Sequence, residues 1–318
     1  MDSLIYSLNV VAPIFLLVIV GYFMRRLHLM SEAFAEEGAK ITFKLALPLS
    51  IFRSIMTSDI SQTFNGKLVF TTLGGIFGTF LILCLVVPRL IKDRPSAATV
   101  VQAIFRSNFL ILGVPMARNM FGEEGMGSTT LLLAFAIPSF NVLAIVAFAI
   151  IANNDPSKSI GSRAAHTFVE VLKNPLFVGA VLGIIFSLGR IRLPGILDSA
   201  TSDIASMATP LALLTMGAQF DFQKFKSSIN VTLIASFCRI IVSPAIIVGT
   251  GILLGFRSYD LGALFVLFSA PTAVSSYVMA KNMGGDGDLA SQVILVTTFF
   301  SMFTITLGIY LLKSFALI

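Results

Sequence analysis

The sequence predicts an all-α integral membrane protein of ten transmembrane helices, arranged as two inverted five-helix repeats. The first observation is composition: 56% of the 318 residues are hydrophobic and only 12% are charged, and the mean hydropathy is +0.92. Soluble domains carry about 25% charged residues, so this composition is typical of a membrane protein. The other two observations are the number of long apolar runs and an internal repeat of the chain.

Ten apolar runs are candidates for crossing a bilayer core, which needs about 20 residues per helix. They cover residues 4–24, 37–57, 67–91, 97–121, 127–152, 170–188, 196–219, 228–254, 259–282 and 288–312. Runs 2, 4, 7 and 9 are each interrupted by Pro, Gly or charge. The first run lacks a basic start and a small-residue cleavage site, so we expect a retained span rather than a signal peptide.

The distribution of Lys and Arg between alternate loops predicts the orientation of the chain. One side holds eleven such residues, namely Arg25, Arg26, Arg89, Lys92, Arg94, Lys158, Arg163, Lys173, Lys224, Lys226 and Lys281. The other side holds six, namely Lys67, Arg118, Arg190, Arg192, Arg257 and Lys313. The richer side is expected to face the cytoplasm, which places both termini outside it, in a multi-pass protein of the cell membrane. The net charge of +6 follows from this bias and does not indicate nucleic-acid binding.

The two halves of the chain resemble each other. Pro13 and Pro175 are 162 residues apart, as are Pro48 and Pro210, and APIFLLVIVG aligns with NPLFVGAVLG on the same offset. We therefore predict a first repeat over 1–152, a cytoplasmic linker over 153–169 and a second repeat over 170–318. Five spans are an odd number, so the second repeat must enter the membrane from the opposite side. That architecture is typical of secondary transporters.

Proline residues near the middle of spans 4 and 9 predict that these helices are broken. Gly113 and Pro115 interrupt span 4, and Pro271 holds the equivalent place in span 9. Proline removes a backbone donor, and the freed groups are tolerated in a membrane only where they line a cavity or meet another polar element. We expect the two breaks to cross at mid-membrane, where the positive ends of half-helices stabilise an anion.

Polar residues near these breaks, together with basic residues inside the spans, are the candidates for an anion site. Interhelical hydrogen bonding is the simpler explanation for each polar residue alone, including Thr209, Thr215 and Gln219 along span 7. The candidate substrate-binding residues are Arg106, Asn108, Gly113, Val114, Pro115, Asn141, Arg239, Ala270, Pro271, Thr272 and Ser275.

Five basic residues fall within or at the edges of apolar spans, and no carboxylate lies at the centre of any span. They are Lys40, Lys44, Arg53, Arg106 and Arg239. Charges inside a membrane are costly and are by default functional, so the absent counter-charge indicates an anionic substrate. We expect Lys40 and Arg53 to extend to the membrane interface instead. Arg239 lies about eleven residues into span 8 and is the hardest to explain that way.

The whole chain resembles the auxin efflux carrier family, which includes plant auxin carriers and bacterial organic-acid permeases. The residues that carry the resemblance are VVAPIFLLVIVGYFMRRLHLMS, FKLALPLSIFRSI, SNFLILGVPMARNMFG, LKNPLF, TPLALLTMGAQF and SAPTAVSSYVMAKNMG, which occur in the family's order. The resemblance implies a scaffold domain (spans 1, 2, 6, 7) and a transport domain (spans 3, 4, 5, 8, 9, 10) that move as an elevator. It also implies a crossover at Pro115 and Pro271, with a carboxylate beside it that contacts Asn108. Dimers occur among relatives, so a homodimer is one expectation.

The expected function is therefore secondary active transport of a small organic anion, either auxin-like or malonate-like. The short linker fits the small bacterial branch of the family and disfavours auxin itself. Two alternatives remain: a sodium-coupled carrier resembling the bile-acid symporters, which have a related fold, and an anion channel. The substrate, the direction of transport and the choice among H⁺, Na⁺ and uniport stay open.

An enzyme is the least favoured class. Asp260 and Asp288 resemble the paired aspartates of intramembrane proteases, but they fall at opposite ends of span 9, about 30 Å apart. The glycine-rich stretch GGIFGTF lacks the lysine that a nucleotide-binding loop requires. Cys84 and Cys238 lie in apolar runs without metal-ligand spacing, so no cofactor and no metal are expected.

Overall fold

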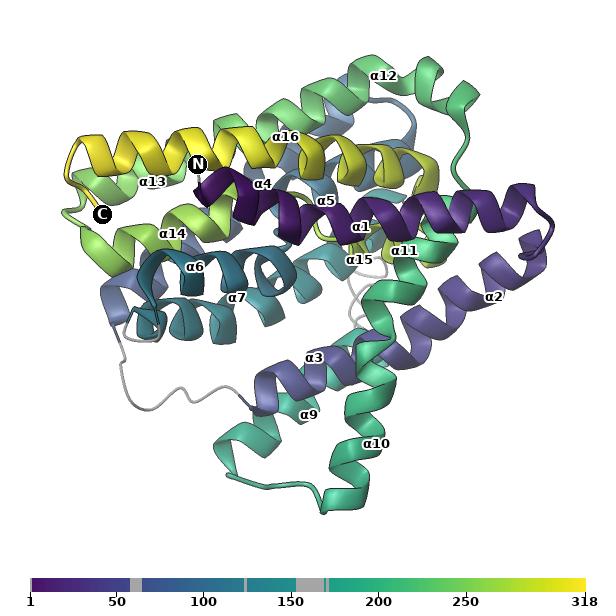
Figure 1. Ribbon diagram of the computed structural model, residues 1–318, viewed down its shortest axis with the longest axis horizontal. Helices are drawn as coiled ribbons and strands as arrows, with labels where there is room; N and C mark the ends of the chain where they lie inside the picture. The colour runs from purple at the N-terminus through teal and green to yellow at the C-terminus, as the bar shows by residue number, and fades with distance from the viewer. Residues whose placement is uncertain (1, 58–64, 123–124, 153–168, 170–171) are drawn as a thin grey trace.

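A computed structural model of the chain describes residues 2–57, 65–122, 125–152, 169 and 172–318. Within these ranges the secondary structure is helical, with one isolated antiparallel β-bridge between Ser107 and Thr272. The predicted linker, 153–169, lies outside the described residues except for residue 169. Both ends of the chain lie toward the same end of the molecule's long axis (Figure 1).

Within its described residues, the first half of the chain forms seven α-helices and three of four short π-helical turns. The α-helices are α1 (Asp2–Arg26), α2 (Glu32–Ile41), α3 (Leu47–Met56), α4 (Gly66–Leu90), α5 (Arg94–Phe105), α6 (Val114–Phe121) and α7 (Met126–Ala147). Three of the π-helical turns are η1 (Thr42–Ala46), η2 (Phe109–Gly113) and η3 (Phe148–Ala152). The fourth, η4 (Cys238–Val242), belongs to the second half.

In the described part of the second half there are eight further α-helices. They are α9 (Pro175–Leu188), α10 (Gly195–Ser206), α11 (Ala208–Ala218), α12 (Phe222–Phe237), α13 (Ser243–Leu253), α14 (Ser258–Ser269), α15 (Ser275–Asn282) and α16 (Gly287–Ser314). Side-chain caps begin several helices: the Asn65 oxygen accepts from the Leu68 amide, and the Asp286 carboxylate accepts from the Leu289 amide. Both caps satisfy backbone donors that a helix start leaves free.

Among the residues that the structure describes, four stretches of helix are long and apolar enough to cross a membrane, namely α4, α7 with η3, α12 and α13 joined through η4 from Ser228, and α16. Their outward faces carry large exposed apolar side chains, among them Phe70 and Leu253. Such faces suit contact with lipid chains. Predicted span 1 lies within the 25 residues of α1, and the other predicted spans are shorter or interrupted helices. Ten spans therefore remain a prediction.

Three of the π-helical turns come directly before a proline. The turns η1, η2 and η4 each end two residues ahead of Pro48, Pro115 and Pro244, respectively, and each proline lies in the first turn of the following helix. A proline ring clashes with the carbonyl one turn earlier in an α-helix, and it has no amide hydrogen to bond there. The wider π turn holds one extra residue and so relieves this conflict.

The predicted break of span 4 at Gly113 and Pro115 is therefore wrong in position. The helix ends at Phe105, and residues 106–108 are the non-helical segment. Pro115 lies in the first turn of α6, where a missing amide hydrogen costs little. In span 9 the break lies at residues 270–274 and includes Pro271, as predicted.

The helices pack into two groups. In the first, α1 and α2 pack on α11, and α3 packs on α9 and α10. In the second, α12 packs on α16, α13 packs on α14, and α7 packs on both α4 and α14. In Figure 1, α3, α9 and α10 lie together at one side of the molecule, away from α12, α13 and α16.

Glycines allow α1 and α11 to touch backbone to backbone. A Cβ atom on Gly21 would lie 2.1 Å from the carbonyl oxygen of Leu214, and one on Gly217 would lie 2.0 Å from that of Val18. No side chain fits at such distances, so these two positions require glycine. Small residues at helix interfaces are the usual means of close packing in membrane proteins.

The α3–α9 pair is built in the same way. A Cβ atom on Gly179 would lie 2.5 Å from the carbonyl oxygen of Pro48, and one on Gly183 would lie 2.9 Å from that of Phe52. Glycine therefore sets the separation of the helices in both principal contacts of the first group.

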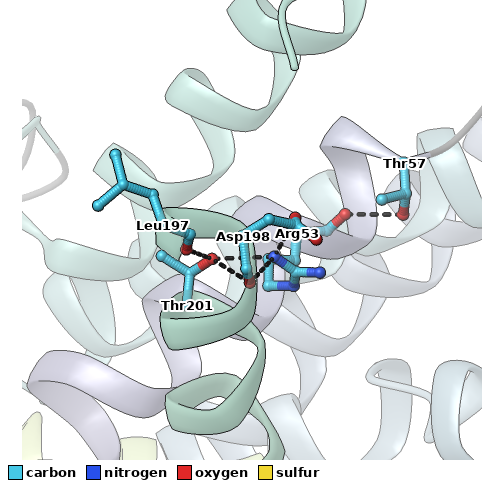
Figure 2. A network of polar contacts seen from close by, with 5 residues as sticks. All are labelled: Arg53, Thr57, Leu197, Asp198 and Thr201. Carbon is cyan, nitrogen blue, oxygen red and sulfur yellow. Dashed lines mark hydrogen bonds and ion pairs between the residues drawn. The ribbon is translucent and has the colours of Figure 1, made fainter. Parts of the chain in front are cut away.

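Arg53, which was expected to extend to the membrane interface, is paired with a carboxylate within the protein. Its Nη1 donates to the carboxylate Oδ1 of Asp198 at 2.7 Å, to the Asp198 carbonyl at 2.8 Å and to Thr201 Oγ1 at 2.9 Å (Figure 2). The side chain of Arg53 is 18% exposed. The bond joins the end of α3 to the start of α10, so a carboxylate supplies the counter-charge here.

Replacing Gly217 with alanine should destabilise the protein, because the added methyl group collides with the backbone of α1. Overpacking of this kind costs about 1–3 kcal/mol. We expect a lower midpoint of thermal unfolding for Gly217→Ala in detergent. Gly74→Ala, on a helix face where a Cβ meets nothing within 4 Å, is the matched control and should unfold like the wild type. Equal midpoints for both variants contradict the close α1–α11 contact.

Candidate functional site

The two helix breaks are joined by backbone hydrogen bonds. The amide of Asn108 donates to the carbonyl of Pro271 at 2.8 Å, and the amide of Ala273 donates to the carbonyl of Arg106 at 3.4 Å. Between these bonds lies the antiparallel bridge of Ser107 and Thr272. Each break thus satisfies backbone groups that the other leaves free, which buried peptide groups require.

Side-chain hydrogen bonds also join the two breaks. The hydroxyl of Thr272 donates to the carbonyl of Ala103 at 2.7 Å, and the hydroxyl of Ser107 donates to the carbonyl of Leu267 at 2.6 Å. Both acceptors belong to the last turn of the helix that precedes the opposite break. The two breaks are therefore held together by side chains as well as by backbone.

Arg239 lies behind the breaks and is completely buried. Its Nε and Nη2 donate to the carbonyl of Ala270 at 3.0 and 2.7 Å, and its Nη1 donates to the carbonyl of Ile104 at 3.1 Å. Longer contacts reach the carbonyls of Phe105 and Leu267 at 3.5 and 3.4 Å. Arg239 belongs to the π turn η4, and carbonyl oxygens at both breaks accept hydrogen bonds from its guanidinium.

A small cavity of about 90 Å³ lies on the other side of the breaks. Its walls come from both helix groups: α3 and α11 on one side, and the two breaks with η2 and α7 on the other. The lining residues with polar side chains are Ser50, Arg106, Ser107, Asn108, Asn141, Thr209 and Ser275. Apolar residues, among them Ile51, Phe140 and Ala212, complete the lining.

Arg106 and Asn108 are the donors that define this cavity. The Arg106 side chain reaches the Oδ1 of Asn141 at 2.6 Å and also contacts the sulfur of Met279. Asn141 in turn donates to the carbonyl of Ile137 at 2.8 Å, which fixes its oxygen toward Arg106. Asn108 is 3% exposed, and its buried Nδ2 has no hydrogen-bond partner among the described residues. An unpaired buried donor is costly, so this amide favours a ligand with acceptor oxygens.

The electrostatic balance of the site is positive. Within the described part of the chain, neither Arg106 nor Arg239 forms an ion pair with a carboxylate. Arg239 is surrounded by carbonyl oxygens, whereas Arg106 lines the cavity with only neutral partners. The cavity can therefore accept an anion with acceptor oxygens, which is what a carboxylate offers.

Of the residues predicted to bind substrate, four line the cavity, namely Arg106, Asn108, Asn141 and Ser275. Seven do not: Gly113, Val114, Pro115, Arg239, Ala270, Pro271 and Thr272. Ala270, Pro271 and Thr272 hold the breaks together through their backbone or side chain, and Arg239 hydrogen-bonds to carbonyl oxygens behind them. Their part in substrate binding thus stays a prediction, and any effect would act through the breaks.

The sequence prediction missed the wall that the first helix group contributes. Ser50 and Thr209 line the cavity from α3 and α11, and Ser107 lines it from the break itself. The available signal was the repeat: Ser50 follows Pro48 by two residues, Thr209 precedes Pro210, and the two prolines are 162 residues apart. Polar residues beside repeat-related prolines are thus a signal by which the second wall could be found.

Apolar spanning helices around a small cationic cavity define a membrane transporter. The model of the membrane transport protein family matches residues 6–309, and the chain belongs to this family. It is the auxin efflux carrier family that the sequence resembles.

Relatives match over almost their whole length. An "Uncharacterized transporter" of Methanothermobacter thermautotrophicus is 24% identical over 95% of this chain and 97% of its own. A "Putative malonate transporter" of Rhizobium meliloti is 23% identical over 97% of each chain. The "Uncharacterized transporter YfdV" of Escherichia coli is 24% identical over 89% of this chain and 91% of its own.

Ser50 should be accessible to water-soluble reagents through the cavity. We expect Ser50→Cys to react with a small charged thiol reagent in detergent-purified protein whose Cys84 and Cys238 are replaced by alanine. Ser269→Cys is the matched control, because Ser269 is 2% exposed and does not line the cavity. Mass spectrometry of the labelled protein measures both. Equal labelling of the two positions contradicts the cavity described here.

Proposed function

We propose that the protein is a secondary carrier that moves a small organic carboxylate across the cell membrane. The observation that carries this proposal is the cavity at the two helix breaks, where the Arg106 guanidinium and the unpaired Asn108 amide face the same space. A carboxylate in that space supplies the charge and the acceptors that these two groups lack.

The volume of the cavity favours a small substrate. About 90 Å³ is the liquid volume of roughly three water molecules, far below the ~300 Å³ at which pockets for drug-sized ligands begin. A three-carbon dicarboxylate such as malonate is closer to this size than indole-3-acetate, whose ring alone exceeds it. The name of the Rhizobium meliloti relative agrees with this choice.

Two groups of helices meeting at the site support an elevator mechanism. We assign α1, α2, α3, α9, α10 and α11, which correspond to spans 1, 2, 6 and 7, to a scaffold domain. The remaining helices, spans 3, 4, 5, 8, 9 and 10, form a transport domain that contains both breaks. The cavity is lined from both groups, so sliding one group along the other exposes the same site to either side.

The glycine contacts support two inverted repeats over 1–152 and 170–318. Gly21 packs against the backbone of Leu214, and Gly183 packs against the backbone of Phe52. Gly21 and Gly183 are 162 residues apart, and so are Phe52 and Leu214. One contact therefore maps onto the other with the offset already seen in the prolines, as expected when a pseudo-two-fold axis relates ten spans.

The remaining parts of the proposal concern orientation, assembly and energy. Both chain ends lie toward the same end of the long axis (Figure 1), which agrees with an even number of spans, and the loop charges favour a location outside the cytoplasm for them. A homodimer is our proposal for the assembly. Export of a monovalent anion down a potential of 100 mV releases about 2.3 kcal/mol, enough to drive uniport without an ion gradient.

Asn108→Ala should weaken carboxylate binding with little effect on folding, because it removes a donor that has no partner in the protein. A hydrogen bond to a charged group contributes about 1.5–3 kcal/mol, which is roughly tenfold or more in affinity. Isothermal titration with malonate measures the change. Asn282→Ala, which removes an amide bonded within its own helix and outside the cavity, should leave the affinity unchanged. Unchanged affinity in Asn108→Ala removes this residue from the site.

Arg106→Gln should abolish saturable uptake, because the cation that lines the cavity is lost while the side chain keeps its polarity. Arg53→Gln is the matched control, since that guanidinium serves Asp198 outside the cavity. It should reduce thermal stability but keep the Michaelis constant of the wild type. Uptake of labelled malonate into proteoliposomes distinguishes the two variants. Saturable uptake at wild-type affinity in Arg106→Gln contradicts an anion site at this residue.

Uptake of labelled malonate and indole-3-acetate into proteoliposomes, under imposed proton, sodium or potential gradients, tests the function as a whole. Saturable malonate uptake that unlabelled carboxylates inhibit supports the carrier, and the effective gradient identifies the driving force. Non-saturable flux favours an anion channel instead. Uptake of indole-3-acetate in preference to malonate overturns the choice of substrate.

A further inference from the structure

We propose that Arg239 is a built-in counter-cation for the two broken helices, and that it occupies the place of a mobile coupling cation. Arg239 is then a positioning residue, which holds the breaks in the geometry that forms the cavity but does not touch the substrate. The inference rests on the proposed carrier function only where it concerns transport. The counter-cation role itself is argued from the contacts of the Arg239 guanidinium alone.

The guanidinium lies where two helix carboxyl ends converge. Ile104 and Phe105 are the last two residues of α5, and their carbonyls face Nη1 at 3.1 and 3.5 Å. Leu267 lies in the last turn of α14 and Ala270 is its C-cap, and their carbonyls face Nη2 at 3.4 and 2.7 Å. Both ends therefore offer unsatisfied carbonyls to one cation.

The charges match in magnitude as well as in sign. A helix carboxyl end is equivalent to about half a negative elementary charge, so two such ends together amount to about one. The arginine side chain carries one positive charge and keeps it under all ordinary conditions. Because no carboxylate in the described ranges forms an ion pair with Arg239, the two helix ends are its counter-charge, and Arg239 is theirs.

The arrangement leaves little for a sodium ion to bind at this point. Hard cations take several oxygen ligands, and here the oxygens are the same carbonyls that accept from Arg239. The hydroxyls of the two breaks themselves are also engaged, since Thr272 donates to Ala103 and Ser107 donates to Leu267. Arg239 is 0% exposed, so its guanidinium fills the space between the two helix ends.

Arg239 and Arg106 are both basic residues within apolar spans, but their surroundings give them different roles. Arg239 neutralises the protein's own helix ends, whereas Arg106 remains uncompensated toward the cavity. An anion that binds beside Arg106 thus needs no accompanying cation. We therefore expect transport and protein stability to be independent of sodium.

The decisive measurement compares thermal unfolding of detergent-purified wild type and Arg239→Ala in sodium chloride and in choline chloride of equal concentration. The wild type should unfold at the same temperature in both salts. Arg239→Ala should unfold at a lower temperature in choline chloride and recover part of the loss in sodium chloride or in millimolar guanidinium chloride. Both cations can enter the space that the side chain leaves. Urea at the same millimolar concentration, which is similar in shape but uncharged, should not restore stability.

Two variants separate charge from packing. Arg239→Lys keeps the cation and should unfold independently of sodium, even if its midpoint falls below that of the wild type. Arg257→Gln is the matched control, because Arg257 also donates to backbone carbonyls, those of Ile252 and Phe256, but at an exposed position. It should acquire no dependence on sodium or guanidinium. If Arg239→Ala does not fold, the comparison of Arg239→Lys with the wild type still tests the sodium dependence.

Transport provides the second readout. Malonate affinity should fall tenfold or more in Arg239→Ala and recover at least partly with guanidinium. Wild-type protein that is stabilised by sodium over choline, or Arg239→Ala that unfolds like the wild type in choline chloride, overturns the inference. Wild-type protein that neither binds nor transports any carboxylate contradicts the proposed function instead, while the unfolding experiments remain decisive for Arg239.

Discussion

Two helices stop inside an apolar bundle, and each stop frees amides and carbonyls where water is scarce. The rest of the structure depends on satisfying them. Asn108 and Ala273 donate across the two stops, and Ser107 and Thr272 donate to the opposite helices. Arg239 donates to carbonyls at both helix ends. Because every unpaired backbone group in such surroundings costs several kcal/mol, the two stops are stable only together. Their pairing in turn creates a polar surface at the boundary of the two helix groups, where the cavity lies.

The same constraint explains why the anion site is small and specific. Most polar atoms near the breaks are committed to one another, and few are left to face the cavity. The groups available to a ligand are the Arg106 guanidinium and the Asn108 amide, with Ser50 and Thr209 on the opposite wall. A ligand that offers a charge and two acceptor oxygens replaces water at little cost. A ligand without them leaves the amide unpaired, and that penalty provides selectivity.

The composition and the apolar runs predicted an all-helical membrane protein, and the motifs that resemble the auxin efflux carriers predicted its family. Four of the candidate substrate-binding residues line the cavity, namely Asn108, Arg106, Asn141 and Ser275. The position of the first break was not predictable from Pro115, because proline is tolerated in the first turn of a helix as well as in a break. The partner of Arg53 could not be foreseen either, since Asp198 is 145 residues away in the sequence. Local patterns encode helices and their faces; which helix ends meet is decided by packing across the whole chain.

The π turns before Pro48, Pro115 and Pro244 change the rotation of the following helices about their axes. A π turn inserts one residue, so the helix that follows is rotated by about 100° relative to an uninterrupted α-helix. The rotation decides which side of α3 carries Ser50. Proline cannot donate the backbone hydrogen bond that an α turn needs, so the wide turn is retained. The rotation of the helix that follows is therefore fixed. Removing a single residue from such a turn would therefore turn the polar side chains away from the breaks while leaving the composition of the helix almost unchanged.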